Sequence, residues 1–195
     1  MGGMEGEIEH RIAEGSKMVG ALREIFKKGL SKEVKMRLDE SVFIPVVTYG
    51  CESWVMNAKV KKKIGVLEMR MLREIAGVRR VDRVRNTRVR DLCGSDVSLI
   101  GLVERRVLRW FGHLTRVNQR RLVKKVFKGE IEGERGRGRP GKRWVDGVKE
   151  VLRELGLTWD EAIEVARDRG RWREVVGFGI ERRERVLGRI SGDGG

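Results

Sequence analysis

The chain has 195 residues, a formal net charge of +15 and an isoelectric point near 10.5. Hydrophobic residues make up 39% of it, which excludes a wholly disordered protein. No apolar run approaches the roughly 20 residues of a membrane span, and the start, MGGMEGEIEH, has no apolar signal core. We therefore expect an intracellular protein, in the nucleus or cytoplasm, without a membrane anchor. The charge favours nucleic acid as the partner, ahead of an acidic membrane surface or an acidic protein.

Apolar residues at helical spacing predict a first helix across residues 8–26, interrupted by Gly15 and Gly20 and ended by Gly29. Ser31 is placed to cap a second helix, because its hydroxyl can accept a hydrogen bond from the first turn. The predicted apolar stripe of that second helix is Val34, Leu38 and Val42.

Pro45 should break or kink the chain after this helix, because proline has no N–H to donate. Asn57 then opens a long helix that Gly77 ends. Its predicted buried stripe is Val60, Ile64, Leu67, Met71 and Ile75. Asn86 is placed to cap a short helix that ends before Gly94.

The best-defined helix covers about residues 97–117 and has two contrasting faces. The predicted core face is Ile100, Val103, Val107, Trp110, Phe111, Leu114 and Val117. At 100° per residue, basic side chains gather on the opposite side and form a predicted binding ridge: Arg105, Arg106, Arg109, His113 and Arg116.

Three further helices are predicted after residue 144. The first is ended by Gly156, and the second, at about 159–168, begins with a capping box between Thr158 and Glu161. Trp172 and the two valines that follow it predict a last, short helix. The fold class is therefore all-α: a helical bundle, then a small helical tail domain joined to it by a basic Gly/Arg/Pro loop.

Positive charge is concentrated in one third of the chain. From Arg79 to Arg143 there are 20 Lys and Arg against 7 Asp and Glu, a net charge of +13. Segregated charge of this kind indicates a binding face for nucleic acid. We divide the chain into four segments: helical 1–78, basic helical 79–128, a flexible basic joint 129–141 and carboxyl-terminal helical 142–190.

The stretch ERGRGRPGKRW, residues 134–144, allows two interpretations. Arg-Gly-Arg-Pro at 137–140 matches the core of an AT-hook, whose side-chain-free backbone lies in a narrow A·T minor groove. The other interpretation is a flexible basic loop that contacts phosphates. Both use the same predicted nucleic-acid-binding residues: Arg135, Arg137, Arg139, Lys142 and Arg143.

Residues for catalysis are missing from the sequence. We find no paired carboxylates, no nucleophile with a neighbouring base and no phosphate-binding loop of the Gly-Lys-Ser/Thr type. Cys51 and Cys93 lie far apart without a nearby histidine, so no metal site is expected and both should be free thiols. We predict a non-enzyme without metal or cofactor.

Four motifs in order carry a resemblance: IPVVTYGCESWVM, LEMRMLREIAGVRRVDRVRN, RRVLRWFGHLTRV and GRGRPGKRWVDGVKEVLRELGLTWDEAIEVARDRGRWREVV. Over residues 8–176 the chain resembles the carboxyl-terminal part of non-LTR (LINE-type) retrotransposon reverse transcriptases, from the polymerase thumb to the tail. The family is an RNA-directed DNA polymerase. Its polymerase motif, an aromatic residue followed by x-Asp-Asp, is not present here, nor is a Cys/His knuckle.

The resemblance implies that residues 1–78 are thumb-like and grip primer–template duplex through phosphates. The thumb candidates are Lys59, Lys61, Lys62, Lys63, Arg70 and Arg73. The ridge and the joint would hold element RNA or target DNA, and the basic stretch between thumb and ridge adds four residues: Arg79, Arg80, Arg83 and Arg85. The catalytic part of a reverse transcriptase is an implied partner.

Three other hypotheses stay open at this stage. A chromatin protein would act through the AT-hook and prefer A·T-rich duplex. A helical interaction protein would use its charge only for solubility. An inert retroelement remnant would have no function.

Overall fold

The computed structural model describes residues 4–117 and 142–192. Over these ranges all regular structure is helical, which confirms the all-α class. The first helices are α1 (Met4–Phe26), α2 (Lys32–Leu38), a π-helical turn (Asp39–Phe43), α3 (Ile44–Val47), α4 (Ala58–Ala76) and α5 (Asn86–Cys93). Two single 3-10 turns, Cys51–Ser53 and Arg80–Asp82, lie in the connections. The later helices are α6 (Leu99–Arg116), α8 (Trp144–Glu154), α9 (Trp159–Arg167) and α10 (Arg169–Gly192).

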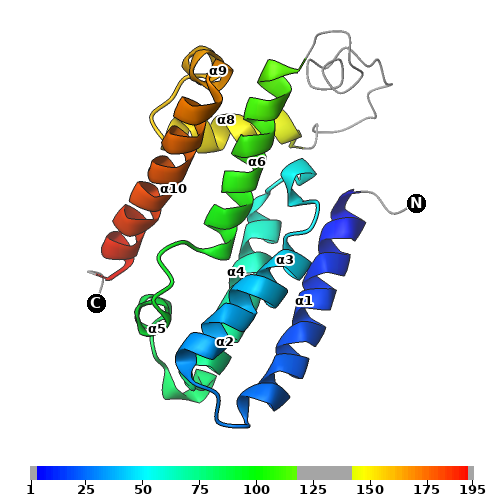
Figure 1. Cartoon of the computed structure of the whole chain (residues 1–195), viewed down its shortest axis with the longest axis vertical. Coiled ribbons are helices and arrows are strands. Elements are labelled where there is room, and N and C mark those ends of the chain that lie inside the picture. The colour runs from blue at the N-terminus through cyan, green and yellow to red at the C-terminus, as the bar shows by residue number, and fades with distance from the viewer. Residues whose placement is uncertain (1–3, 118–141, 193–195) are drawn as a thin grey trace.

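Helix α6 lies between two groups of helices. Figure 1 shows α1 to α4 on one side of it and α9 and α10 on the other, with α8 crossing behind it. One connected apolar core runs through both groups, from Ile8 on α1 to Ile180 on α10. The borders of the four predicted segments stay a prediction, and the joint at 129–141 lies outside the described residues.

The predicted helix boundaries are confirmed where side-chain caps define them. Asn57 accepts a hydrogen bond from the Val60 amide at 2.9 Å, and Ser31 caps α2 in the same way. Thr158 and Glu161 form the reciprocal capping box. Gly77 ends α4 at a φ of 68°, a left-handed conformation that glycine adopts without a Cβ penalty. At α5 the cap falls one residue early, because Arg85 takes that position and Asn86 is the first helical residue.

The predicted stripe of α4 is confirmed, since all five of its residues are buried. The stripe predicted for the second helix is wrong at Val34, whereas Leu38 is partly buried against the core. Val34 is 41% exposed, and α2 buries none of its residues. The chain changes to a π-helical turn at Asp39, before Pro45, and the buried side chains there follow a different spacing: Asp39, Phe43 and Val47. The wider π turn shifts which face of the chain meets the core.

The interruption predicted at Gly15 and Gly20 is also wrong, because α1 continues through both. Gly15 is buried where α1 crosses two neighbours. A Cβ at this position would lie 2.6 Å from Val47 Cγ2 and 2.7 Å from Leu67 Cδ2. At Gly20 no atom lies within 4 Å of the same position. The first glycine therefore permits close packing, whereas the second is only exposed.

The last helix was predicted to be short and is not: α10 has 24 residues. Its buried residues Trp172, Val176 and Ile180 recur every four positions and pack along α6 and α9. Five glycines along the helix and many charged residues weaken the pattern in the sequence, yet the packed face extends the helix beyond it.

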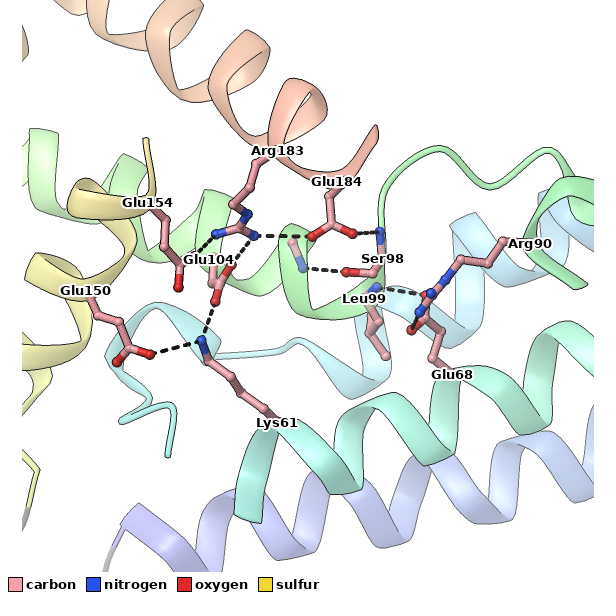
Figure 2. Close-up of polar contacts among 11 residues, drawn as sticks. Lys61, Glu68, Arg90, Ser98, Leu99, Glu104, Glu150, Glu154, Arg183 and Glu184 are labelled. Carbon is pink, nitrogen blue, oxygen red and sulfur yellow. Dashed lines mark hydrogen bonds and ion pairs between the residues drawn. The ribbon is translucent and has the colours of Figure 1, made fainter. Parts of the chain in front are cut away.

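A buried carboxylate joins α6 to its neighbours (Figure 2). Glu104 on α6 is 2% exposed and receives Lys61 Nζ of α4 at 3.0 Å and the guanidinium of Arg183 from α10. Arg183 also contacts Glu154 of α8 at 2.7 Å, so four helices meet at one charged cluster. Lys61 reaches a second α8 carboxylate, Glu150, at 3.6 Å.

The amino-terminal end of α6 is held by two more carboxylates. Glu184 of α10 accepts a hydrogen bond from the Ser98 amide at 3.3 Å, and the Ser98 hydroxyl caps the helix at Gly101. Glu68 of α4 accepts from the Leu99 amide at 3.1 Å and pairs with Arg90 at 2.8 Å. Because both acceptors are on other helices, the position of α6 is fixed from two sides.

The two glycines of α1 form a matched test. We expect Gly15→Ala to lower the free energy of unfolding by about 1–3 kcal/mol, because the added methyl overpacks the contact with Val47 and Leu67. Gly20→Ala should raise it by up to about 1 kcal/mol through helix propensity alone. Urea denaturation measures both. Equal effects of the two substitutions would contradict the close packing at Gly15.

Buried Asp39 predicts a pH dependence of stability. Burial, followed by the charges of Glu68 and Glu40, raises the pKa of this carboxyl from 3.8 to about 7. The unfolded chain releases the proton at lower pH, so the free energy of unfolding should fall between about pH 4 and pH 7. Asp39→Asn should flatten this fall in denaturation curves, and the exposed control Asp91→Asn should not. If the free energy of unfolding fell equally with pH in wild type and in Asp39→Asn, Asp39 would be excluded as the cause.

Candidate anion-binding groove

The site begins with an unusually close approach of α6 and α10. A Cβ on Gly112 would lie 2.3 Å from the indole nitrogen of Trp172, so glycine alone lets this side chain lie against α6. The buried indole donates a hydrogen bond to the Leu108 carbonyl at 2.9 Å and contacts Phe111, at 5.5 Å between ring centroids. The first turns of α10 are thereby held against the carboxyl-terminal half of α6.

This contact brings five basic side chains to one open groove of about 730 Å³. Three come from one face of α6, at spacings of four and three residues, and two come from the first turns of α10. We call it the α6/α10 groove and define it by Arg109, His113, Arg116, Arg169 and Arg173. No carboxylate of the described residues lines it.

The arginines of the groove repel one another. Desolvation, then the charges of Arg105 and Arg173, lowers the pKa of Arg109 below its usual range. Desolvation and Arg169 lower the pKa of Arg116 in the same way. One nitrogen of the Arg116 guanidinium donates a hydrogen bond to the Ala166 carbonyl of α9. Positive groups held together without a counter-charge make a site that favours an anion.

The charge of the side chains that α10 presents to α6 changes along the two helices. Further along, α10 presents carboxylates: Glu181 pairs with Arg105 at 3.1 Å, and Glu184 reaches the start of α6. Where Arg169 and Arg173 face Arg109, no acid of the described residues lines the groove. The groove is therefore confined to one end of the helix pair.

The predicted ridge is divided by this arrangement. Arg109, His113 and Arg116 line the groove, whereas Arg105 is held by Glu181. Arg106 is half-buried and donates to the Thr48 carbonyl at 3.0 Å. All five stay predicted nucleic-acid contacts, but only three share a surface.

A second basic groove, of about 810 Å³, lies along α4 and the start of α5. It takes in five predicted residues: Lys62, Arg70, Arg73, Arg79 and Arg80. Gly65, Val66 and Met69 add an apolar floor. Arg73 is fixed inside it by hydrogen bonds to the Val84 carbonyl at 3.0 Å and to Asn86 at 2.8 Å. Glu74 is the acid of this groove and pairs with Arg23 of α1.

Several other predicted residues contact acids of the same chain. Lys61 binds Glu104, and Lys63 binds Glu9 of α1. Lys142 donates to the Met56 carbonyl at 2.9 Å and pairs with Glu150. Arg143 pairs with Asp146 at 3.1 Å, and this hydrogen bond raises the pKa of the guanidinium. These contacts give the four side chains a structural role as well.

The remaining predicted residues are exposed or not described. Lys59, Arg83 and Arg85 are exposed on α4 and around the turn before α5. The predicted AT-hook and basic loop, with Arg135, Arg137 and Arg139, lie outside the described residues.

Arg169 and Arg173 were missed from the sequence. Their four-residue spacing around Trp172 places them on one face of a helix, which a prediction of the full α10 would have indicated. Their position opposite Arg109 depends on the packing of two helices more than 50 residues apart in the chain, and no local pattern reports it.

Two chemical features hold for the described part of the chain. No group of three or more His, Cys, Asp or Glu side chains there could hold a metal ion. Cys51 and Cys93 are buried free thiols, and burial raises the pKa of both.

None of the described helices combines the length and apolar character that a membrane crossing requires.

Comparison with known proteins finds a relative derived from a transposon. The chain is 24% identical over 159 residues to an uncharacterized transposon-derived protein of Caenorhabditis elegans, a match that covers 74% of this chain and 54% of that protein. The chain thus spans about half the length of this relative. No protein-family model matches it, and no solved structure does.

The groove predicts stabilisation by multivalent anions. Tripolyphosphate should raise the thermal midpoint of the wild-type protein, because a ligand that binds only the folded state stabilises it. Arg109→Gln combined with Arg173→Gln should remove most of this shift. The control, Arg37→Gln with Arg153→Gln, loses the same charge at exposed positions elsewhere and should keep it. Equal shifts of the thermal midpoint in both double variants would show that the stabilisation depends only on net charge and not on the groove.

Proposed function

We propose that the chain is a non-catalytic nucleic-acid-binding module, derived from the thumb and tail of a non-LTR retrotransposon reverse transcriptase. The observation that carries this proposal is the α6/α10 groove, where five basic residues meet and no carboxylate of the described ranges lines the surface. The relative named as transposon-derived supports the origin of the chain in a mobile element. The motif resemblance supports the reverse transcriptase as the source.

Nucleic acid fits the groove better than a small anion because of how the charge is distributed. The four arginines spread over two helices, and a second basic groove follows α4. Guanidinium groups bind phosphate oxygens through two hydrogen bonds at once, which suits a repeating phosphate backbone. Contacts of this kind position a nucleic acid without reading its sequence.

Catalysis would have to come from elsewhere. The sequence has no Asp-Asp pair of the polymerase type, so we propose that the chain grips nucleic acid and performs no synthesis of its own. The catalytic part of a reverse transcriptase is the partner that this role implies. Primer extension with the chain alone should give no product.

The retroelement remnant remains the second candidate, favoured by the transposon-derived relative. A remnant without function would bind nucleic acid no better than any protein of charge +15. The AT-hook hypothesis depends on residues outside the described ranges, and a preference for A·T-rich duplex over mixed duplex would support it.

The salt dependence of binding tests the proposed function. Arg109→Gln with Arg173→Gln should weaken binding to mixed duplex DNA and to structured RNA, and reduce the slope of log K against log salt for the DNA by about 2. Fluorescence anisotropy across a salt series measures it. The control, Arg37→Gln with Arg153→Gln, should retain the wild-type slope. An unchanged slope in the groove variant would exclude the groove as the binding surface.

A further inference from the structure

The α6/α10 groove contains one ring among its guanidinium groups. His113 is exposed and lines the groove, and its imidazole stacks on the indole of Trp110. The ring centroids are 5.0 Å apart and the planes differ by 18°. Trp110 is half-buried and does not line the groove. The two rings are three residues apart on α6, so the helix itself holds them together.

Stacking on Trp110 leaves one face of the His113 imidazole available. The indole covers one face, and the ring is nonetheless exposed beside Arg109 and Arg116. A surface histidine without such support would move among rotamers and lose entropy on binding. Here the imidazole is positioned in advance, which lowers that cost.

We propose that His113, supported by Trp110, is the stacking surface for an unpaired base, while the arginines of the groove hold the adjacent phosphates. This inference rests on the proposed function and specifies its ligand as single-stranded nucleic acid or an unpaired end. In a continuous duplex each base is already stacked on its neighbours, so its face is not offered to a protein ring. Aromatic stacking combined with a basic groove is the physical basis of single-strand binding.

The charges around the ring favour this ligand over an apolar or acidic peptide. Arg109 and Arg173 line the groove together with His113, no carboxylate of the described residues lines it, and the arginine planes can also stack on bases. No aliphatic residue of the described parts of the chain lines the groove to receive an apolar peptide side chain. Its chemistry is guanidinium and one flat ring, which matches phosphate and base.

Two substitutions separate stacking from hydrogen bonding at this position. His113→Phe keeps a flat ring and removes the polar nitrogens, and His113→Gln keeps a hydrogen-bond donor and removes the ring. The probes are a short single-stranded oligonucleotide with one 2-aminopurine and a blunt duplex longer than the groove. Anisotropy gives the affinities, and quenching of 2-aminopurine fluorescence reports stacking.

We expect His113→Gln to weaken single-strand binding about 10-fold and to reduce the quenching, with duplex affinity little changed. His113→Phe should retain both the affinity and the quenching. A loss in His113→Phe equal to that in His113→Gln, or equal losses on single strand and duplex, would overturn the stacking role. A wild-type protein that binds neither probe would instead overturn the proposed function.

Discussion

The buried carboxylate of Glu104 is the contact on which the arrangement of the helices depends. It lies on α6 and receives cations from α4 and α10, while Arg183 carries the link on to α8. A buried ion pair gains little over an apolar contact, because each charge loses its hydration. Removing one partner, however, leaves the other charge buried and unpaired, which costs several kcal/mol. The cluster therefore specifies one way of packing these helices more than it increases stability.

That packing decides which of the many cations remain available for a partner. The chain has 44 Lys and Arg and 29 Asp and Glu. Every acid can therefore have a basic partner, whereas some of the cations must remain without an acidic one. Glu104, Glu68 and Glu181 neutralise Lys61, Arg90 and Arg105 on α6 and the helices around it. Arg109 and Arg173 lie beyond the reach of these acids. The location of the groove is therefore set by where the carboxylates lie, more than by the number of arginines.

Sequence patterns predicted the fold where the physics is local. Caps at Asn57 and Thr158 depend on a side chain and an amide three residues away, and the α4 stripe depends on one helical period. The sequence patterns gave wrong predictions where the structure depends on contacts between residues far apart in the chain. Gly15 is suited to a helix only because Val47 and Leu67 pack against it, and α2 loses its stripe at a π turn that no propensity indicates. Half of the groove was predictable from α6, whereas Arg169 and Arg173 required the tertiary contact.

One turn of α6 supplies both halves of the proposed site. Gly112 has no side chain, so Trp172 can approach and bring the arginines of α10 into place. His113, the next residue, is exposed beside those arginines and stacks on Trp110. A substitution at Gly112 would therefore separate the groove arginines, which we propose to bind phosphate, from the proposed stacking ring. In the Trp-Phe-Gly-His sequence at 110–113, a supporting ring, a core residue, a position of close approach and the proposed base platform follow one another along a single helical turn.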